Sequence, residues 1–414
     1  MAIYNFSNDT HITIKALTSY LESSKQDTQK VINQLPMREI AETLKITNHL
    51  KDGNLKGPAL ESFISDYLNL TTKLHNKNYL AHQISNPNTN GAIASLIDGL
   101  TNNETSIYEM GPAATTIEFY MVNWMLEKIG WTPTPIPSEQ SSPKNFIHSG
   151  GVLTNGGSLA NLTAMLAARS AQFPNFWKEG SSGNIVILVP EQSHYSLKRT
   201  AGIMGLGEDN CITMPADADG RVLANKIPEL IKTLKAKNNK IMAIVGNACG
   251  TAAGLYDPLD EIGDICHEHG IWFHVDAAHG AGAIVCQEYR HLVAGIEKAD
   301  SIIWDAHKMF RTPALCAAIL VKNHKHLDGA FSQDASYLQH EKEEPGIDYF
   351  PKTVECTKTG LGLKMFMSIA ETGEKGIEDY ITGRNKLAQK AAEYINTLEG
   401  FECPVIPETN ILCF

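Results

Sequence analysis

Short apolar runs alternate with amphipathic stretches through the middle of the chain, and this alternation restricts the fold more than any other feature. The apolar runs are rich in β-branched residues and lie at 184–190, 240–247, 271–278, 301–307 and 316–322. Helical periodicity occurs between them, in "RVLANKIPELIKTLKAK", "PLDEIGDICHEHG" and "EYRHLVAGIEKA". Strands that are apolar on both faces and separated by helices form mostly parallel sheets with both faces covered. The sequence therefore predicts an α/β fold with a mostly parallel central sheet and flanking helices.

The segments on either side of this region differ from it in character. Residues 1–88 are polar with helical periodicity, and residues 112–131 form a long amphipathic helical pattern. Residues 331–359 are polar and punctuated by Pro and Gly, as in a long mobile loop or lid. A helical stretch follows, and the final "NILCF" is typical of the start of a strand. We expect an N-terminal helical arm at 1–88, a large domain at 89–370, and the start of a small, apparently truncated C-terminal domain at 371–414.

Composition excludes several classes of function. The net charge of −11 and the absence of a basic run argue against nucleic-acid binding. No basic-then-apolar leader begins the sequence, and no apolar run reaches the roughly 18–20 residues that a membrane span needs. The eight cysteines form no CxxC pair and are expected to be reduced, which favours a cytoplasmic enzyme or binding protein. We expect no metal site, because the residues of "CHEHG" lack the i, i+4 spacing that metal ligands on a helix use.

A glycine-rich turn precedes a helical pattern in "TNGGSLANL", where Gly157 and Ser158 follow Gly156. Such a turn presents free backbone N–H groups and the positive end of the helix dipole, which suit a phosphate. The sequence fits neither the dinucleotide-binding nor the Walker pattern. Ser158 could equally be an ordinary helix cap.

Two charged side chains stand at the ends of predicted strands. Asp276 ends the run in "IWFHVDAAHG", and Lys308 follows the run at 301–304. In α/β proteins, ligands bind beyond the carboxyl ends of the parallel strands. Desolvation there lowers the pKa of a lysine and prepares its amine to react with a carbonyl group. The alternatives are a helix cap or backbone-bonded carboxylate for Asp276 and a snorkelling strand-end lysine for Lys308.

Together these three features point to one ligand. An anion site, a carboxylate and an amine at one sheet edge match a phosphate, a basic ring nitrogen and an aldehyde. Pyridoxal 5′-phosphate (PLP) carries all three groups, and Asp276 would keep its pyridine nitrogen protonated so that the ring acts as an electron sink.

Several spaced motifs strengthen this interpretation. "TNGGSLANL", "HVDAAHG" and "DAHK" occur in this order, along with "YLAHQIS", "YEMGPAATTIE", "PEQSHYSLKRTAGIMGLG" and "GTAAGLYDPLDEI". In these motifs the chain resembles the group II PLP-dependent amino-acid decarboxylases from about Tyr79 to Lys364. The resemblance implies a fold of the aspartate-aminotransferase type (fold type I). It also implies a homodimer with active sites at the subunit interface, for which the helix at 112–131 is a candidate.

The resemblance also assigns roles to residues of the cofactor site. Lys308 would bind the aldehyde covalently, and Asp276 would bind the pyridine nitrogen. Gly157 and Ser158 would hold the phosphate. The residues with supporting roles would be His307 beside the phosphate, His194 stacked on the ring, Thr251 beneath it and Ala278 packed against it.

Other implied roles concern the substrate. Tyr349 falls where the family keeps a mobile-loop tyrosine that protonates the carbanion after carbon dioxide leaves. Gln83 matches a glutamine that contacts the substrate carboxylate, and the neighbouring His82 is either a second substrate contact or a structural residue. Two positions depart from the family pattern, His279 in the expected substrate pocket and Asp305 near the expected phosphate.

The function implied is PLP-dependent α-decarboxylation of an L-amino acid, with an acidic or short polar substrate. Two alternatives are another reaction on the same fold (an aminotransferase, an aldolase or a decarboxylation-dependent oxidative deaminase) and a relative that has lost activity. His194 and Tyr349 favour decarboxylation, and the intact set of Asp276, His194 and Lys308 argues against loss of activity.

Overall fold

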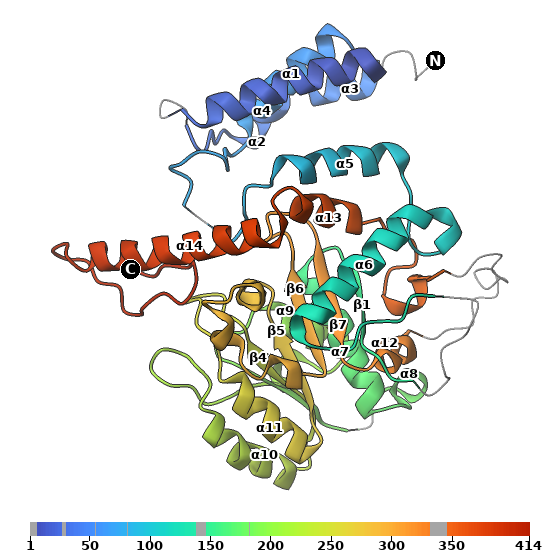
Figure 1. Cartoon of the computed structure of the whole chain (residues 1–414), viewed down its shortest axis with the longest axis vertical. Helices are drawn as coiled ribbons and strands as arrows, with labels where there is room; N and C mark the ends of the chain where they lie inside the picture. The colour runs from blue at the N-terminus through green and yellow to red at the C-terminus, as the bar shows by residue number, and fades with distance from the viewer. Residues whose placement is uncertain are drawn as a thin grey trace. The chain divides into compact units, whose positions relative to one another are not determined.

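The computed structural model describes residues 6–26, 30–53, 55–80, 82–137, 146–181, 183–331 and 346–414 (Figure 1). The chain forms two compact units, one ending at Asn86 and one beginning at Pro87, and each is described by itself. The first unit is helical, and its helices are α1 (Phe6–Ser24), α2 (Met37–Thr43), α3 (Ile46–Asp52) and α4 (Pro58–Leu70).

The second unit is built on a seven-stranded sheet with the order β1-β7-β6-β5-β4-β2-β3. Its strands are β1 (Gly150–Thr154), β2 (Ile185–Val189), β3 (Cys211–Thr213), β4 (Lys240–Asn247), β5 (Trp272–Asp276), β6 (Ser301–Asp305) and β7 (Ala317–Val321). β7 is antiparallel to both of its neighbours, and the other neighbouring strands pair in parallel. The sheet is thus mostly parallel, as predicted.

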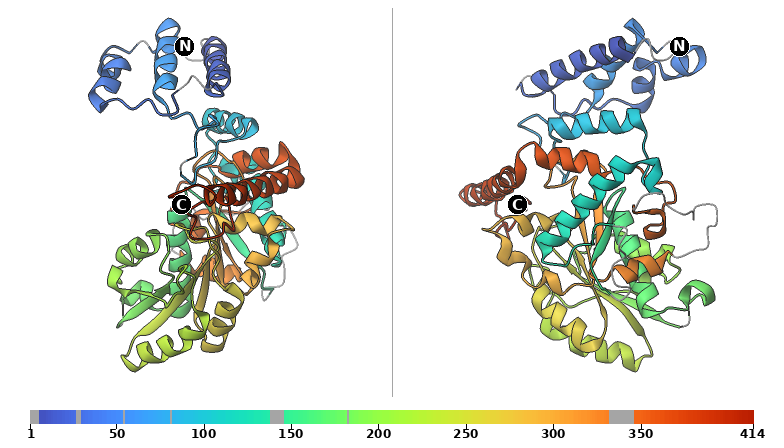
Figure 2. Two further views of the ribbon diagram at one scale, coloured as in Figure 1. Left: turned by 90° about the vertical axis from the view of Figure 1, so that its left-hand side faces the viewer. Right: turned by 45° about the vertical axis from the view of Figure 1, so that its right-hand side comes forward.

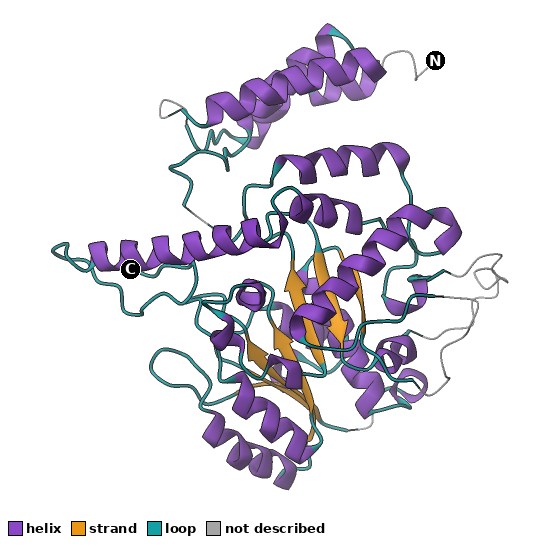
Figure 3. Ribbon diagram, viewed as in Figure 1, coloured by secondary structure: helices purple, strands orange, loops and turns teal. Residues whose placement is uncertain are grey.

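Helices cover both faces of this sheet, shown in orange in Figure 3. Side chains alternate between the faces along each strand, so Trp304 of β6 packs with one apolar cluster and Ile303 with the other. The first cluster includes α6 (Pro112–Ile129), α10 (Ile227–Ala236) and α11 (Leu259–His269), and the second includes α7 (Gly157–Gln172), α9 (Ser196–Ile203) and α12 (His324–Ala330). Burial on both faces explains why the strand sequences read as continuous apolar runs.

Four other helices complete the second unit: α5 (Thr89–Thr101), α8 (Phe176–Glu179), α13 (Gly362–Ala370) and α14 (Gly373–Ile395). α5 packs on α13, and α14, the long red helix of Figures 1 and 2, contacts the 3-10 turn η5 (Gly280–Val285). The other 3-10 turns are η2 (Tyr108–Met110), η3 (Glu208–Asn210), η4 (Ala224–Lys226), η6 (Arg290–Val293), η7 (Ile296–Lys298) and η8 (Phe350–Lys352).

Two local predictions were wrong. The segment 288–299 forms the turns η6 and η7 rather than a helix, because Gly295 between them adopts a φ of 84°. The final residues 411–414 form no strand. α6 packs against β1 and α13 of its own chain, and the role of the helix at 112–131 in a dimer interface stays a prediction.

Candidate active site

The carboxyl ends of five parallel strands meet at one edge of the sheet. β1, β2, β4, β5 and β6 all run in the same direction, because β1 and β6 both pair antiparallel with β7 and the others pair in parallel. Each of these strands is followed by predicted site residues: Gly157 and Ser158 after β1, His194 after β2, Thr251 after β4, Asp276 and Ala278 at the end of β5, and His307 and Lys308 after β6. The topology therefore brings the predicted cofactor residues to one edge.

Glycines connect β1 to the first turn of α7. Gly156 has a φ of 103°, a conformation that residues with a side chain rarely adopt, and α7 begins at the next residue. A Cβ added to Gly157 would lie 2.8 and 2.9 Å from the two carboxylate oxygens of Asp305. The first turn of α7, with its backbone N–H groups and the positive end of its dipole, is thus directly beside the end of β6.

The buried Asp276 is held by two neutral donors. Its Oδ2 accepts a hydrogen bond from Asn161 Nδ2 at 3.0 Å, and its Oδ1 accepts one from the backbone N–H of Ala278 at 3.2 Å. The residue is 6% exposed. A carboxylate at this depth, held only by neutral donors in these two bonds, would be stabilised further by a cationic N–H group.

Asn161 lies at the centre of a hydrogen-bond network that also fixes His194. Its Nδ2 donates to Ser196 Oγ at 2.9 Å, and this hydroxyl lies 2.7 Å from His194 Nδ1. A hydroxyl that accepts from Asn161 is free to donate to His194. The pattern therefore assigns the ring proton of neutral His194 to Nε2. Burial lowers the pKa of His194, with the nearby Asp276 charge opposing the effect, so the neutral form is favoured.

The same network continues below Asp276 through His274, in the middle of β5. His274 Nε2 lies 2.9 Å from Asn161 Oδ1, and His274 Nδ1 lies 2.8 Å from Ser301 Oγ. Burial lowers the pKa of His274 to about 4, so the ring is neutral at pH 7. Because Asn161 Nδ2 is the donor to Asp276, its Oδ1 accepts from His274 Nε2–H, which holds the amide in that orientation.

Lys308 lies beside two other polar side chains of the segment that follows β6. Its Nζ is 3.7 Å from Asp305 Oδ2, and His307 Nε2 is 3.6 Å from the same oxygen. His307 Nδ1 lies 2.8 Å from the carbonyl oxygen of Cys316, which accepts its proton. Burial raises the pKa of Asp305 to about 7, although the Lys308 charge opposes the shift.

The residues present at this edge fit PLP. Asp276 provides a buried carboxylate for a ring nitrogen, and Lys308, with a side chain 17% exposed, provides an accessible amine. Asp305 Oδ1 is buried and has no hydrogen-bond partner among the described residues, as expected beside a polar ligand group. These residues would hold the ring nitrogen, the aldehyde and the phosphate of the cofactor.

Comparison with known proteins shows which family of PLP-dependent proteins the chain belongs to. The family model described as the pyridoxal-dependent decarboxylase conserved domain matches residues 59–414. L-aspartate decarboxylase dtxS4 of Metarhizium robertsii is 30% identical over 396 residues, which cover 94% of this chain and 76% of that protein. The chain belongs to the pyridoxal-dependent decarboxylase family.

Other relatives agree with this assignment. Acidic amino acid decarboxylase GADL1 of Bos taurus is 27% identical over 391 residues, covering 93% of this chain and 72% of that protein. The crystal structure of mouse CSAD superposes with a TM-score of 0.88 at 24% identity, covering 99% of this chain and 82% of that one. The predicted family, fold, cofactor and reaction are confirmed: this decarboxylase is a PLP-dependent carboxy-lyase that acts on an amino acid.

Tyr349 of this decarboxylase was expected on a mobile loop, but the structure buries it. Its side chain is 2% exposed and packs in the second apolar cluster, and its backbone N–H donates to Ser106 O at 3.0 Å. Lys358 Nζ lies 5.4 Å from the centre of its ring and forms a fully buried ion pair with Glu118 at 2.6 Å. A mobile position for Tyr349 is therefore not what the structure shows. Residues 332–345 of the predicted lid lie outside the described part of the chain.

The predicted substrate residues lie in the first unit, and the other predicted cofactor residues differ in their exposure. His82 and Gln83 belong to the first unit, and His82 has a φ of 64°. Left-handed backbone at a non-glycine residue is often found at functional sites, but the role of these two residues in substrate binding stays a prediction. Ser158 and Thr251 are exposed, and Ala278 is half-buried.

His279 differs from the expected pocket residue because it is buried against the C-terminal segment. Its Nε2 lies 2.8 Å from Asn410 Oδ1, and burial lowers its pKa to about 4. His279 is thus a neutral residue that joins β5 to the end of the chain. Sequence patterns alone did not indicate Asn161, Ser196 or Asn410. His274 carried a signal, since it is a polar residue inside an apolar strand.

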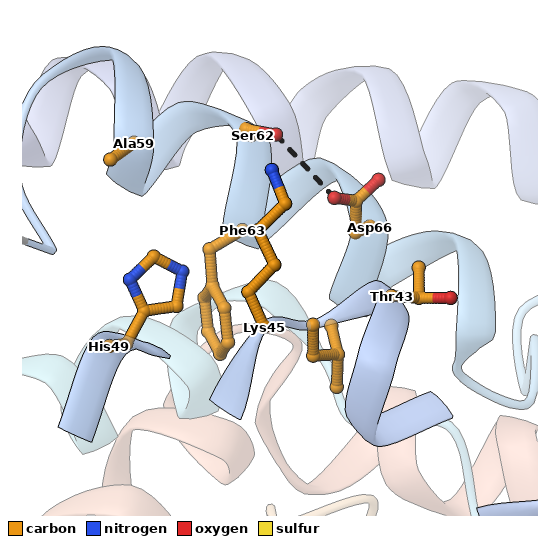
Figure 4. Close-up of a pocket in the computed structure, with 8 residues that line it drawn as sticks. Thr43, Lys45, His49, Ala59, Ser62, Phe63 and Asp66 are labelled. Carbon is orange, nitrogen blue, oxygen red and sulfur yellow. Dashed lines mark hydrogen bonds between the residues drawn. The ribbon is translucent and has the colours of Figure 1, made fainter. Parts of the chain in front are cut away.

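A pocket in the first unit is a separate feature (Figure 4). It encloses about 60 Å³ between α2, α3 and α4, and Ser62 Oγ donates to Asp66 Oδ2 along α4 at 3.5 Å. Ligand sites usually enclose about 300–1,000 Å³, so this pocket is too small for an amino acid and a cofactor. Within the described residues, no helix combines the length and the apolar character needed to cross a membrane.

Proposed function

We propose that this decarboxylase acts on an acidic amino acid such as aspartate, glutamate or cysteine sulfinate. The observation that carries the proposal is the substrate named for several of its relatives. They include acidic amino acid decarboxylase, L-aspartate decarboxylase and cysteine sulfinic acid decarboxylase. A second candidate is 2,4-diaminobutyrate, because L-2,4-diaminobutyrate decarboxylase of Acinetobacter baumannii is 27% identical over 412 residues.

A substrate panel tests this choice. Carbon dioxide release is measured for all twenty amino acids, cysteine sulfinate, diaminobutyrate and ornithine at equal concentrations. We expect the kcat/KM of one acidic substrate to exceed those of diaminobutyrate, ornithine and the aromatic amino acids by about a hundredfold, because unpaired charges are strongly rejected by a specific site. Highest kcat/KM for diaminobutyrate or an aromatic amino acid would contradict the proposal.

Each site residue has a separate role in the proposed reaction. Bound PLP supplies a conjugated ring that accepts the electron pair left at Cα when carbon dioxide departs. Lys308 would hold the aldehyde end of the cofactor, and Asp276 would keep a proton on the ring nitrogen. Neutral His194 would pack on the ring without adding a second positive charge, and the Asn161 network holds both Asp276 and His194 in position. Gly157, Ser158 and His307 would form the phosphate end, while Thr251 and Ala278 would flank the ring.

Substitution of two tyrosines tests which one donates the proton to Cα. Tyr349 was predicted for this role, but its side chain is buried beside the Glu118–Lys358 pair. The segment 331–359 contains one other tyrosine, Tyr337. We expect Tyr349→Phe to lower kcat by less than about threefold. Tyr337→Phe should lower kcat by about a hundredfold or divert the reaction to side products, since general acid catalysis is typically worth 10²–10⁴-fold. Amine and aldehyde products are measured by chromatography, and a hundredfold loss confined to Tyr349→Phe would restore the original assignment.

We also propose that the decarboxylase is a cytoplasmic homodimer with its active sites at the subunit interface. All eight cysteines are unpaired, which is usual in a reducing compartment. α5 exposes an apolar stripe at helical spacing, formed by Ile93, Leu96, Ile97 and Leu100, and a second copy could cover it. A monomeric mass in sedimentation experiments on the cofactor-loaded enzyme would contradict the dimer.

A further inference from the structure

The carboxyl group of Asp305 occupies an unusual position for an acid. It lies against Gly157 in the first turn of α7, where the two oxygens come within 3 Å of the position that a Cβ on Gly157 would take. The residue is 4% exposed, and its Oδ1 has no hydrogen-bond partner among the described residues. Under the proposed function, the same helix turn receives the phosphate of PLP. An ionised carboxylate and a phosphate dianion cannot share this space without strong repulsion.

The neighbouring histidine indicates where a proton is held. His307 Nδ1–H donates to the carbonyl oxygen of Cys316 at 2.8 Å, so in the neutral ring Nε2 carries a lone pair. Nε2 lies 3.6 Å from Asp305 Oδ2, beyond hydrogen-bonding distance, so neutral His307 supplies no proton that would stabilise an ionised carboxylate. Burial lowers the pKa of His307, so the proton is more stable on the carboxyl group than on the ring.

The charged groups around Asp305 are few. Lys308 Nζ lies 3.7 Å away and favours the ionised carboxylate, whereas Asp276 on β5 disfavours it. The thiol of Cys316, before β7, has its pKa raised by burial to about 12 and carries no charge near pH 7. The first turn of α7, at Gly157 and Ser158, carries no titratable side chain. Bound PLP would add a phosphate dianion at this turn, while the charge of Asp276 would be balanced by the protonated ring nitrogen that it holds.

We propose that Asp305 takes up a proton when the phosphate of the cofactor binds, and that the neutral acid then donates a hydrogen bond at the phosphate end of the site. Asp305 is thus a positioning residue whose protonation couples cofactor affinity to pH. This inference rests on the proposed placement of PLP at α7, and it goes further by assigning a protonation state to one residue of the chain.

The sign of the coupling follows from proton linkage. Burial raises the pKa of Asp305 in the free protein to about 7. Below that pH the carboxyl group is already protonated, and binding needs no additional proton. Above it, each unit of pH makes the required proton about tenfold less available, so affinity for PLP falls by about tenfold per unit. A phosphate bound beside Asp305 raises the pKa of its carboxyl group further, and above that higher pKa the affinity for PLP stops falling with pH.

The test compares wild type with Asp305→Asn, which keeps the shape and a donor but cannot ionise. Dissociation constants for PLP and for pyridoxal, which has no phosphate, are measured from pH 6 to pH 9 by the absorption of the lysine-bound cofactor. Any effect of Asp305 on Lys308 is common to PLP and pyridoxal, so the comparison of the two ligands isolates the effect of the phosphate. The affinity of Asp305→Asn for PLP relative to wild type should rise by about tenfold per pH unit above about pH 7. The same ratio for pyridoxal should stay constant.

Two results would overturn the inference. One is a PLP ratio that does not change with pH. The other is an equal change with pyridoxal, which would mean that Asp305 acts on Lys308 and not on phosphate. The wild-type protein gives a second measurement that does not depend on folding of the variant. At pH 8, it should take up about one more proton per PLP bound than per pyridoxal bound, as measured by calorimetry in buffers of different ionisation enthalpy. Equal uptake would contradict the inference. Absence of the absorption band with both ligands at every pH would overturn the cofactor assignment as well.

Discussion

Replacing Lys308 with alanine is expected to abolish decarboxylation, with a loss of kcat/KM of about 10⁴-fold or more. The side chain follows β6 at the edge where five parallel strands end, and it is the lysine that lies beside Asp305 and His307. Without its amine, the cofactor loses its covalent bond to the protein and must bind through Asp276 and the phosphate alone. Carbon dioxide release and the absorption band of the lysine-bound cofactor should disappear together.

Lys322→Ala is the matched control for this substitution. Lys322 also follows a strand of the same sheet, but β7 runs antiparallel to its neighbours, so Lys322 lies at the opposite edge. Its Nζ donates to the backbone oxygen of Glu297 at 2.9 Å. This bond lies at the edge of the sheet opposite the proposed active site. Activity of Lys322→Ala should be within about twofold of wild type. Substantial activity in Lys308→Ala would remove this lysine from the mechanism.

Replacing Asp276 with asparagine should lower kcat by between about a hundredfold and a few thousandfold. Asparagine keeps the size and one acceptor oxygen, but it cannot hold a positive charge on the ring nitrogen. Loss of one partner from a buried charge pair costs about 3–5 kcal/mol, and each 1.36 kcal/mol corresponds to a factor of ten. Steady-state kinetics with saturating PLP measure the loss.

Asn161→Ala separates the charge of Asp276 from its orientation. It leaves the carboxylate in place but removes the Nδ2 donor at 3.0 Å, together with the bond to Ser196. A hydrogen bond to a charged group is worth about 1.5–3 kcal/mol, so its loss should lower kcat by about tenfold or somewhat more. Asp276→Asn that retains more than a tenth of wild-type kcat would contradict the assigned role of this carboxylate.

The sequence predicted the sheet and its charged edge because both depend on local patterns. Apolar runs mark strands that are buried on two faces, and the residue types at their ends are read directly, as with Asp276 and Lys308. β1 was missed because the glycines of Gly150–Thr154 weaken the strand pattern, and β3 because it has only three residues. Asn161 could not be related to His274 and Asp276, since these contacts join residues more than a hundred positions apart.

Tyr349 and His279 show that burial of a single side chain could not be predicted from the sequence. Tyr349 occurs in a polar stretch, and His279 directly follows an apolar run at the expected ligand-binding edge, so exposure at a loop or pocket is the natural expectation for both. Both are buried in the structure: Tyr349 beside Lys358 and His279 against Asn410. Burial of this kind depends on which distant segment covers a residue, and neither periodicity nor composition contains that information. The sequence identified Asp305 as an unexpected acid. Its contact with Gly157, seen only in the structure, places this acid beside the proposed phosphate position.

The position of the covalent bond to the cofactor tests the central claim most directly. The purified enzyme is incubated with PLP, reduced with borohydride, digested and analysed by mass spectrometry. The added mass of the reduced cofactor should be found on the peptide that contains Lys308, in "DAHKMF", and fragmentation should place it on that lysine. Modification of a different lysine, or no modification despite decarboxylase activity, would contradict the proposed site.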